Sequence, residues 1–219
     1  MEQSSFVEFD KVKEWDRKQD RDVKRNIILD AAEQVFSHKD YHEAVLDEIA
    51  GVAGLSKATL YLYFKNKIDL FFSVIERKLW ELGQVVVNAT VDYVNPVTAI
   101  KRLINDELAF FADNAAFFRV FYAQRHDFQF RAQVDEDEIH ERVKPFVISK
   151  TDAVAKVIKC GQEIGAFQSV NERDAAFMLI SLIHTCVLIQ LLEPENVVPM
   201  KDRAELVEKI FLNGLLVRE

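Results

Sequence analysis

Apolar residues recur at spacings of three and four positions through most of the chain, which is the pattern of a helix with one buried face. In the N-terminal third, this pattern predicts a helix at about residues 22–38 and a short helix at about 46–53 that ends before Gly54. Ser56 and Asn66 are of types that cap helix N-termini, so a third helix is expected after Ser56 and a longer fourth one after Asn66.

Five more helices are predicted in the rest of the chain. Pro96 suits a first helical position, another helix is expected to start near Asn114, and long apolar patterns cover about 138–163, 171–192 and 202–216. The total is about nine helices. Six glycines and four prolines in 219 residues leave little room for hairpin turns. The sequence therefore predicts an all-α protein.

Charge is distributed unevenly along the chain. The net charge is −8, made up of −2 for residues 1–20, 0 for 21–80 and −6 for 81–219. An acidic protein is a poor binder of polyanions as a whole, but a neutral segment can still present a positive face. A contact with nucleic acid is therefore expected within residues 21–80, and residues 1–20 are expected to form a charged arm that is flexible or partly helical.

The cysteines and the apolar runs indicate the cellular compartment. Cys160 and Cys186 form no CxxC pair and lie in no His/Cys cluster, which argues against a disulfide scaffold and a zinc module. The charged first twenty residues lack the apolar core of a signal peptide, and no unbroken apolar run approaches a membrane span. We therefore expect a cytoplasmic protein with no metal, no other cofactor and no membrane partner.

Residues 45–67 have the spacing of a helix-turn-helix. Ala50 is small where two helices touch, Gly54 permits the sharp turn, and Leu60 is an apolar anchor for the second helix. The hydroxyls and amines left on the outer side of this short second helix suit phosphates and base edges in a major groove. The alternative is a helical hairpin with a purely structural role.

These residues resemble a known family. The segment AGLSKATLYLYFKNKIDLF (53–71) is similar to the signature of TetR-type (TetR/AcrR) transcriptional regulators, and IILDAAEQVF (27–36) and DYHEAVLDEIA (40–50) match the positions around it. The resemblance implies an all-helical homodimer. A three-helix DNA-binding head, here residues 21–67, would precede a body, here 68–219, that binds a small molecule and dimerises through its last two helices.

The resemblance also assigns roles to single residues. It implies groove-facing side chains at Lys57, Ala58, Thr59 and Tyr61, and phosphate-binding side chains at Ser56, Tyr63 and Lys67. The family usually has glycine at position 40 and threonine at 44 or 45, where this chain has Asp40, Ala44 and Val45. The missing hydroxyl removes a helix cap and a phosphate contact, and the lost cap costs about 1 kcal/mol of helix stability.

Aromatic residues are concentrated between positions 110 and 130, where seven of the 17 phenylalanines lie. Each of them can be ordinary core packing, but together they exceed what one helix face needs, so a pocket for an apolar ligand is expected here. The candidate lining residues, with polar groups from this region and from the apolar helix near the C-terminus, are Phe110, Phe111, Phe117, Phe118, Phe121, Tyr122, Arg125, His126, His184 and Gln190.

The helix expected at about 174–192 is apolar on nearly all sides and must be covered on all of them. A second copy of the chain, packed through the last two helices, is the simplest cover. The residues expected at this interface are Phe177, Ile180, His184, Val187, Leu188, Leu191, Leu206, Ile210 and Phe211. The alternative is the central helix of a monomer.

The sequence thus predicts a ligand-responsive repressor that binds a palindromic DNA operator as a dimer. A hydrophobic small molecule, such as a fatty acid, an acyl-CoA or a drug-like compound, would release it. One alternative is an acyl-ligand-binding protein or enzyme, although no nucleophile, base and orienting group stand at recognisable spacing. Another is a DNA-binding protein without ligand control. Glu136 and His140, four residues apart, can be read as metal ligands or as part of an acidic helix start, which we favour.

Overall fold

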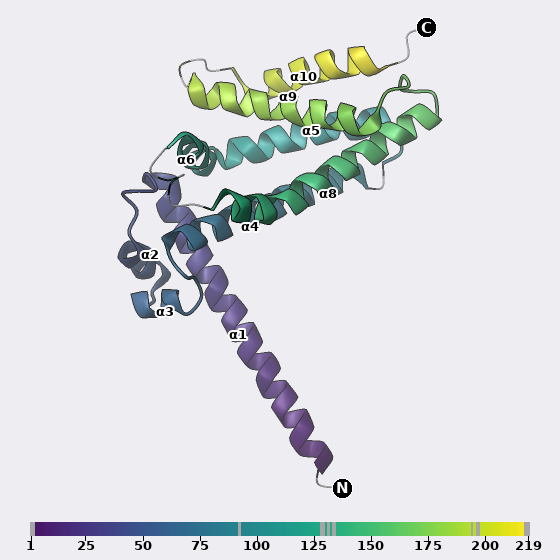
Figure 1. Ribbon diagram of the computed structural model, residues 1–219. Coiled ribbons are helices and arrows are strands. Elements are labelled where there is room, and N and C mark those ends of the chain that lie inside the picture. Colours follow the sequence, from purple (N-terminus) through teal and green to yellow (C-terminus); the bar gives the residue numbers. More distant parts are fainter. Residues whose placement is uncertain are drawn as a thin grey trace. The chain divides into compact units, whose positions relative to one another are not determined.

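The computed structural model describes residues 3–91, 93–127, 130, 132, 135–193, 195 and 198–216, and side chains from residue 20 onward except those of Arg125, His126, Glu136, Glu138 and Ile139. The helices of this part of the chain are α1 (Gln3–His38), α2 (Leu46–Ala53), α3 (Lys57–Tyr61), α4 (Lys67–Thr90), α5 (Pro96–Asp113), α6 (Ala115–His126), α8 (Glu136–Glu163), α9 (Glu172–Leu192) and α10 (Met200–Leu215) (Figure 1). The all-α prediction is confirmed.

The chain divides into two compact units, unit 1 (Met1–Ile75) and unit 2 (Glu76–Glu219). The boundary between the two units therefore lies within α4, after Ile75, whereas the sequence predicts it between residues 67 and 68. Asn66 caps α4 as predicted, because its Oδ1 accepts a hydrogen bond from the Asp69 N–H at 2.8 Å. The first turns of α4 therefore belong to unit 1 and the remainder to unit 2.

Unit 1 is built on α1, which is much longer than the sequence analysis expects. The structure continues this helix back to Gln3, through the segment that the sequence analysis treats as a flexible or partly helical arm. No glycine or proline lies within the first 38 residues to end a helix. Figure 1 shows α1 (purple) extending well past α2 and α3.

The core of unit 1 contains a group of three aromatic rings among buried aliphatic side chains. The ring centroid of Phe71 lies 5.0 Å from that of Phe36 and 5.0 Å from that of Tyr41. Leu60 is buried, as its predicted role of apolar anchor requires, and Phe64 is buried as well. The ring contacts hold α1, the segment after it and the start of α4 together.

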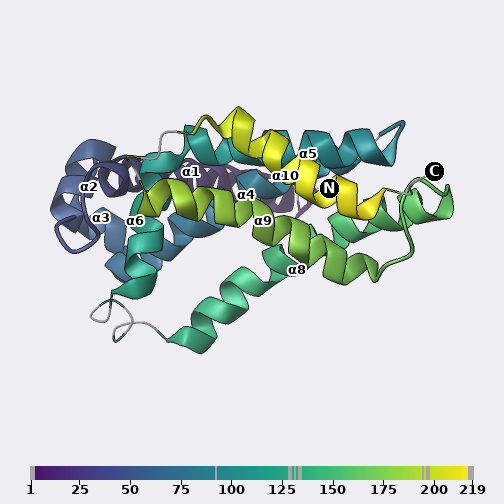
Figure 2. The same ribbon diagram turned by 90° about the horizontal axis from the view of Figure 1, so that it is seen from above.

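Unit 2 contains α5, α6, α8, α9 and α10 together with the end of α4. The start of α5 is fixed by Asn95, whose Oδ1 accepts hydrogen bonds from the Val97 N–H at 2.8 Å and the Thr98 N–H at 3.4 Å. Asn171 caps α9 in the same way, because its side chain accepts hydrogen bonds from the Arg173 and Asp174 N–H groups. Helix α9 packs against α8, α10 and α5, and Figure 2 shows it between α8 and α10.

Helix α9 contains no unbroken apolar run of membrane-spanning length, because polar residues such as His184 and Gln190 interrupt it. Its 21 residues are long and apolar enough by length and composition to cross a membrane. Core helices of water-soluble bundles meet the same criterion. In this structure α9 packs against α8, α10 and α5, while part of its apolar surface remains exposed.

Candidate nucleic-acid interface and effector body

The turn between α2 and α3 has the geometry of a helix-turn-helix. Gly54 ends α2 in the left-handed conformation (φ 66°), which a residue with a side chain rarely adopts. The Leu55 N–H then donates to the Ala50 carbonyl at 2.9 Å. Ser56 caps α3, because its Oγ accepts a hydrogen bond from the Thr59 N–H at 3.1 Å. The predicted end of α2 at Gly54 and the predicted cap of α3 at Ser56 are therefore confirmed.

The predicted DNA-binding residues are brought together around α3. Ser56, Lys57, Ala58 and Tyr61 are exposed, and Thr59 and Tyr63 are partly exposed. The Ser56 and Thr59 hydroxyls lie 2.8 Å apart and form a hydrogen bond with each other. The turn thus presents hydroxyl groups and an exposed aromatic ring on one short helix.

The ammonium group of Lys57 is already paired with a carboxylate, although the side chain is exposed. Its Nζ donates to Asp47 Oδ2 on α2 at 2.7 Å. This hydrogen bond, with the charge of Asp47, raises the pKa of Lys57 above its ordinary value. A phosphate or base edge must therefore compete with this carboxylate for the ammonium group.

The role implied for Lys67 is corrected by the structure. Its Nζ donates to the carbonyl oxygens of Tyr41 at 2.7 Å, Ala44 at 2.9 Å and His42 at 3.4 Å. It also lies 4.3 Å from the centroid of the Tyr41 ring, and burial lowers its pKa. An ammonium group has three protons, and three carbonyls already accept them. Lys67 therefore fastens the segment between α1 and α2 and is not available as a phosphate ligand.

The unpaired cations of unit 1 lie elsewhere. Arg21 and Lys24, three residues apart on α1, and Lys65, just before α4, are exposed. None of the ion pairs within the described part of the chain involves these three side chains. Arg21 and Lys24 were not predicted because they precede the motif, although their three-residue spacing on one helix is visible in the sequence. Lys65 lies within the motif and was not predicted either.

Helix α2 has no side-chain cap at its N-terminus, as predicted. Val45 occupies the N-cap position in an extended conformation, and its side chain makes no capping hydrogen bond. The preceding Ala44 is fully buried. The N-terminal N–H groups of α2 therefore lack the side-chain acceptor that threonine would supply.

Replacing Val45 with threonine should therefore stabilise unit 1 by about 1 kcal/mol. The Val45 side chain is 51% exposed, so the hydroxyl enters without clash or cavity. We expect a higher midpoint of thermal unfolding for the whole chain, measured by circular dichroism. Val45→Ala is the control, because it removes apolar bulk without adding an acceptor. A Val45→Thr midpoint no higher than that of the control would contradict the prediction.

The predicted aromatic cluster forms in unit 2. Phe118 on α6 lies 4.7 Å from Phe111 on α5, measured between ring centroids, and 6.5 Å from Phe121 and from Tyr122. His184 of α9 packs edge-on against Phe111 at 5.7 Å. Most of these pairs have the edge-to-face geometry of stable aromatic packing. The rings therefore form a packed cluster that links α5, α6 and α9.

The other residues predicted to line the ligand pocket differ in where the structure places them. Phe110 and Phe117 belong to the same cluster, with centroids 6.1 Å and 5.6 Å from that of Phe118. Gln190 is partly exposed near the end of α9. The side chains of Arg125 and His126 lie outside the described residues. The cluster thus unites the aromatic candidates and His184.

A buried ion pair in unit 2 was not found from the sequence. Lys150 Nζ on α8 donates to Glu107 Oε2 on α5 at 2.6 Å, and the Glu107 side chain is fully buried. Burial raises the pKa of Glu107, and the charge and hydrogen bond of Lys150 act against that rise. The sequence did contain a sign of this pair. The helical spacing of the apolar residues places Glu107 on the buried face of α5.

The predicted interface residues divide into two groups. Phe177, Leu206 and Ile210 are exposed, as an interface requires. Ile180, Val187 and Phe211 are instead buried within the unit, and His184, Leu188 and Leu191 are partly buried. Ile180 and Val187 are not available to a second copy because they lie on the side of α9 that packs against helices of its own unit. A helix that is apolar all round does not reveal this side from its sequence.

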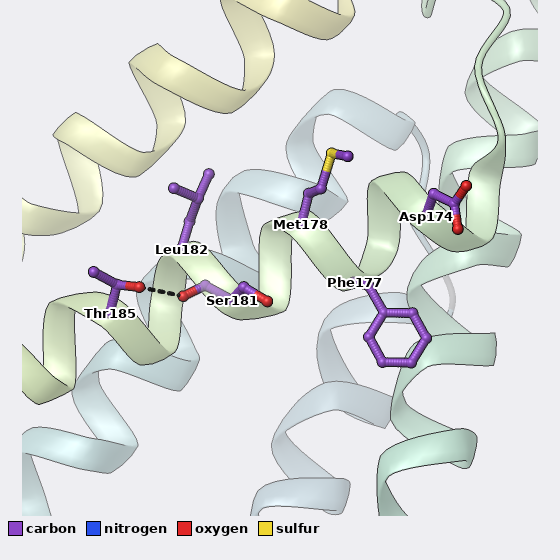
Figure 3. Close-up of a pocket in the computed structure, with 6 residues that line it drawn as sticks. All are labelled: Asp174, Phe177, Met178, Ser181, Leu182 and Thr185. Carbon is purple, nitrogen blue, oxygen red and sulfur yellow. Dashed lines mark hydrogen bonds between the residues drawn. The ribbon is translucent and has the colours of Figure 1, made fainter.

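The exposed side of α9 contains residues that were not predicted. A hollow on this surface is lined by Asp174, Phe177, Met178, Ser181, Leu182 and Thr185 (Figure 3). Met178 is 64% exposed and Phe177 is 42% exposed. The Thr185 Oγ1 donates to the Ser181 carbonyl at 2.8 Å, so this polar group is satisfied within the helix. The surface offers apolar side chains with little competing polarity.

Comparisons with known proteins agree with this geometry. Residues 28–74 match the family model described as bacterial regulatory proteins, tetR family. The chain is 30% identical over 138 residues to the HTH-type transcriptional activator FasR of Mycolicibacterium smegmatis, covering 63% of this chain and 60% of that protein. It is 35% identical over 89 residues to the HTH-type transcriptional repressor BepR of Brucella suis, covering 40% and 43%. The matched part thus spans less than two thirds of these relatives.

The fold is shared with a solved structure. The transcriptional regulator FadR from Bacillus subtilis, in complex with stearoyl-CoA, superposes with a TM-score of 0.72 at 18% identity, over 86% of this chain and 97% of that one. The matched residues 28–74 contain the α2–α3 turn whose geometry is described above. The resemblance stated from the sequence is thereby confirmed. Residues 28–74 are thus similar to the DNA-binding region of the tetR family of bacterial regulatory proteins.

Proposed function

We propose that this protein is a dimeric, ligand-responsive transcriptional regulator that binds a palindromic DNA operator and acts as a repressor in the cytoplasm. The observation that carries the proposal is the exposed surface of α3, held by the Gly54 turn and the Ser56 cap. Binding of this kind requires no catalytic group. The relatives include both an activator and a repressor, so the sign of regulation is part of the proposal.

Two kinds of contact would hold the DNA. Lys57, Thr59 and Tyr61 of α3 would face the base edges, with Lys57 exchanging Asp47 for the DNA. Arg21, Lys24 and Lys65 would neutralise phosphates, because they are exposed and form no ion pair in the described part of unit 1. Unit 1 therefore owes its electrostatic attraction more to α1 than to the motif itself.

A dimer would give the operator its twofold symmetry. The exposed apolar residues of α9 and α10, Phe177, Met178, Leu206 and Ile210, are the surface that we assign to the second copy. Two recognition helices would then enter the major groove about one helical turn apart, roughly 34 Å. The operator is expected to be a palindrome for this reason.

An apolar effector would bind in unit 2. The FadR relative was solved with stearoyl-CoA, and the aromatic cluster of this chain supplies an apolar environment for such a compound. The effector would disfavour DNA binding through α4, which belongs to both units. Arg142 of α8 donates to both carboxylate oxygens of Glu76 on α4, at 2.7 Å and 2.8 Å, so a movement of α8 would be passed to α4. A coupling of roughly 1 to 3 kcal/mol is sufficient for a switch.

Salt-dependent DNA binding tests the proposal. We expect the whole protein to bind a duplex selected from a random-sequence library, with the logarithm of affinity falling linearly with that of salt concentration. Each phosphate contact removed should make this slope shallower by about 0.9. Arg21→Ala and Lys24→Ala should each show that change, whereas Lys67→Met should leave the slope of the folded protein unaltered. The measurement is fluorescence anisotropy.

Lys201→Ala, an exposed position on α10, is the matched control and should change neither slope nor affinity. Lys57→Ala should weaken binding to the selected duplex more than binding to random duplexes, since it acts on base edges. Failure to select any duplex at low salt would refute the proposed function.

A further inference from the structure

The Glu107–Lys150 pair leaves one oxygen unsatisfied inside unit 2. Lys150 occupies Oε2 at 2.6 Å, while Oε1 is buried and has no hydrogen-bond partner among the described residues. The Glu107 side chain is fully buried and that of Lys150 is 10% exposed, so both charges have been withdrawn from water. A buried acceptor without a donor destabilises a fold, which makes such an atom a candidate for binding another molecule.

The buried neighbours of Glu107 on α5 are apolar. Glu107 lies one helical turn before Phe111, the α5 member of the aromatic cluster. On the same helix, Leu103, Ile104 and Leu108 are buried and contribute no polar side chain. An apolar compound that enters this region with a suitable polar group would gain both burial and a hydrogen bond.

A second oxygen in the same state lies on α6. Gln124 is 4% exposed, and its Oε1 is buried without a hydrogen-bond partner in the described part of the chain. Gln124 lies one helical turn after Phe121 and two turns after Phe117 on α6, and both phenylalanines belong to the aromatic cluster. The helices that form the cluster therefore carry two unsatisfied acceptors. Acceptors need donors, so the polar group of a matching ligand must carry N–H or O–H.

We propose that Glu107 Oε1 accepts a hydrogen bond from the effector, which is therefore an apolar compound bearing an amine or a hydroxyl group. Lys150 is a positioning residue that holds the carboxylate through Oε2. The inference rests on the proposed function and narrows its effector class. A fatty acid is disfavoured, because its ionised head has no donor and would meet Glu107 as a like charge.

Four probes of similar length test the donor requirement on the whole protein: decylammonium, decan-1-ol, 1-methoxynonane and decanoate. Decan-1-ol and 1-methoxynonane are isomers that differ in the presence of an O–H donor. We expect decylammonium and decan-1-ol to bind at least about tenfold more tightly than 1-methoxynonane, with decanoate weaker still. Isothermal titration calorimetry measures the four affinities.

Glu107→Gln should invert part of this ranking. The Lys150 ammonium can only donate, so the amide oxygen should stay with Lys150, and the NH₂ group should take the place of Oε1. Decylammonium should then lose about tenfold in affinity and 1-methoxynonane should gain, while decan-1-ol, which both donates and accepts, should change little. Glu163→Gln, at the exposed end of α8, is the matched control and should preserve the original ranking.

A purely structural role for Glu107 would weaken all probes alike in Glu107→Gln, and that result would overturn the inference. So would wild-type protein that binds 1-methoxynonane as tightly as decylammonium, or that binds neither donor probe. If the variant does not fold, the wild-type ranking decides alone. Loss of DNA binding would refute the proposed regulator, whereas these probe results with DNA binding intact would refute only the donor site.

Discussion

Replacing Met178 with glutamate should disrupt the proposed dimer and weaken binding to the proposed DNA operator about 100-fold. Met178 is 64% exposed on the side of α9 that its own unit leaves uncovered. In a twofold interface each substitution appears twice, so two carboxylates would be buried without partners. The cost of burying an unpaired charge exceeds what the surrounding apolar contacts return.

Analytical ultracentrifugation at micromolar concentration measures the loss of the dimer, and anisotropy on the selected duplex measures the loss of affinity. Val94→Glu is the matched control, because Val94 is a fully exposed apolar residue between α4 and α5. It should leave both properties unchanged. A Met178→Glu protein that remains dimeric would show that the second copy does not pack on this side of α9.

Replacing Gly161 with alanine should destabilise unit 2 by about 3 kcal/mol. A Cβ at this position would lie within 2.0 Å of the Phe167 ring, a distance that real side chains do not show. The ring cannot easily withdraw, because the segment that carries it is held to the end of α10. The Gln168 N–H donates to the Leu215 carbonyl at 2.8 Å, and Phe167 forms an antiparallel bridge with Leu216.

Chemical denaturation followed by circular dichroism measures this loss. Gly83→Ala is the control with the opposite sign. Nothing lies within 4 Å of a Cβ at this helical position, so alanine should stabilise α4 by about 0.5–1 kcal/mol. In a Phe167→Ala background, Gly161→Ala should cost much less, because the clashing ring is absent. An equal cost in both backgrounds would show that the ring contact is not the cause.

The helix-turn-helix shows how far local sequence signals reach. Gly54 and Ser56 were correctly predicted to end α2 and to cap α3, since both act within a few residues of their position. The same approach implied a phosphate contact for Lys67. That implication failed because the carbonyls that occupy the ammonium are supplied by residues 41–44, more than twenty positions away.

The candidate effector region shows the same division. Its aromatic residues could be predicted from their density in one segment, and the rings do meet. Glu107 could not be assigned a partner, because Lys150 lies 43 residues further along the chain. An unsatisfied oxygen is a property of everything packed around it, so no local pattern reports it.

The sequence alone located most of the helices and the residues that cap α3 and α4, because helical periodicity and capping are interactions between near neighbours. It did not reveal that α1 begins at Gln3. The tertiary structure decided which charges are already neutralised, which side of α9 stays exposed and which buried oxygen lacks a donor. Those three properties depend on contacts between segments distant along the chain, and only the folded packing brings these segments together.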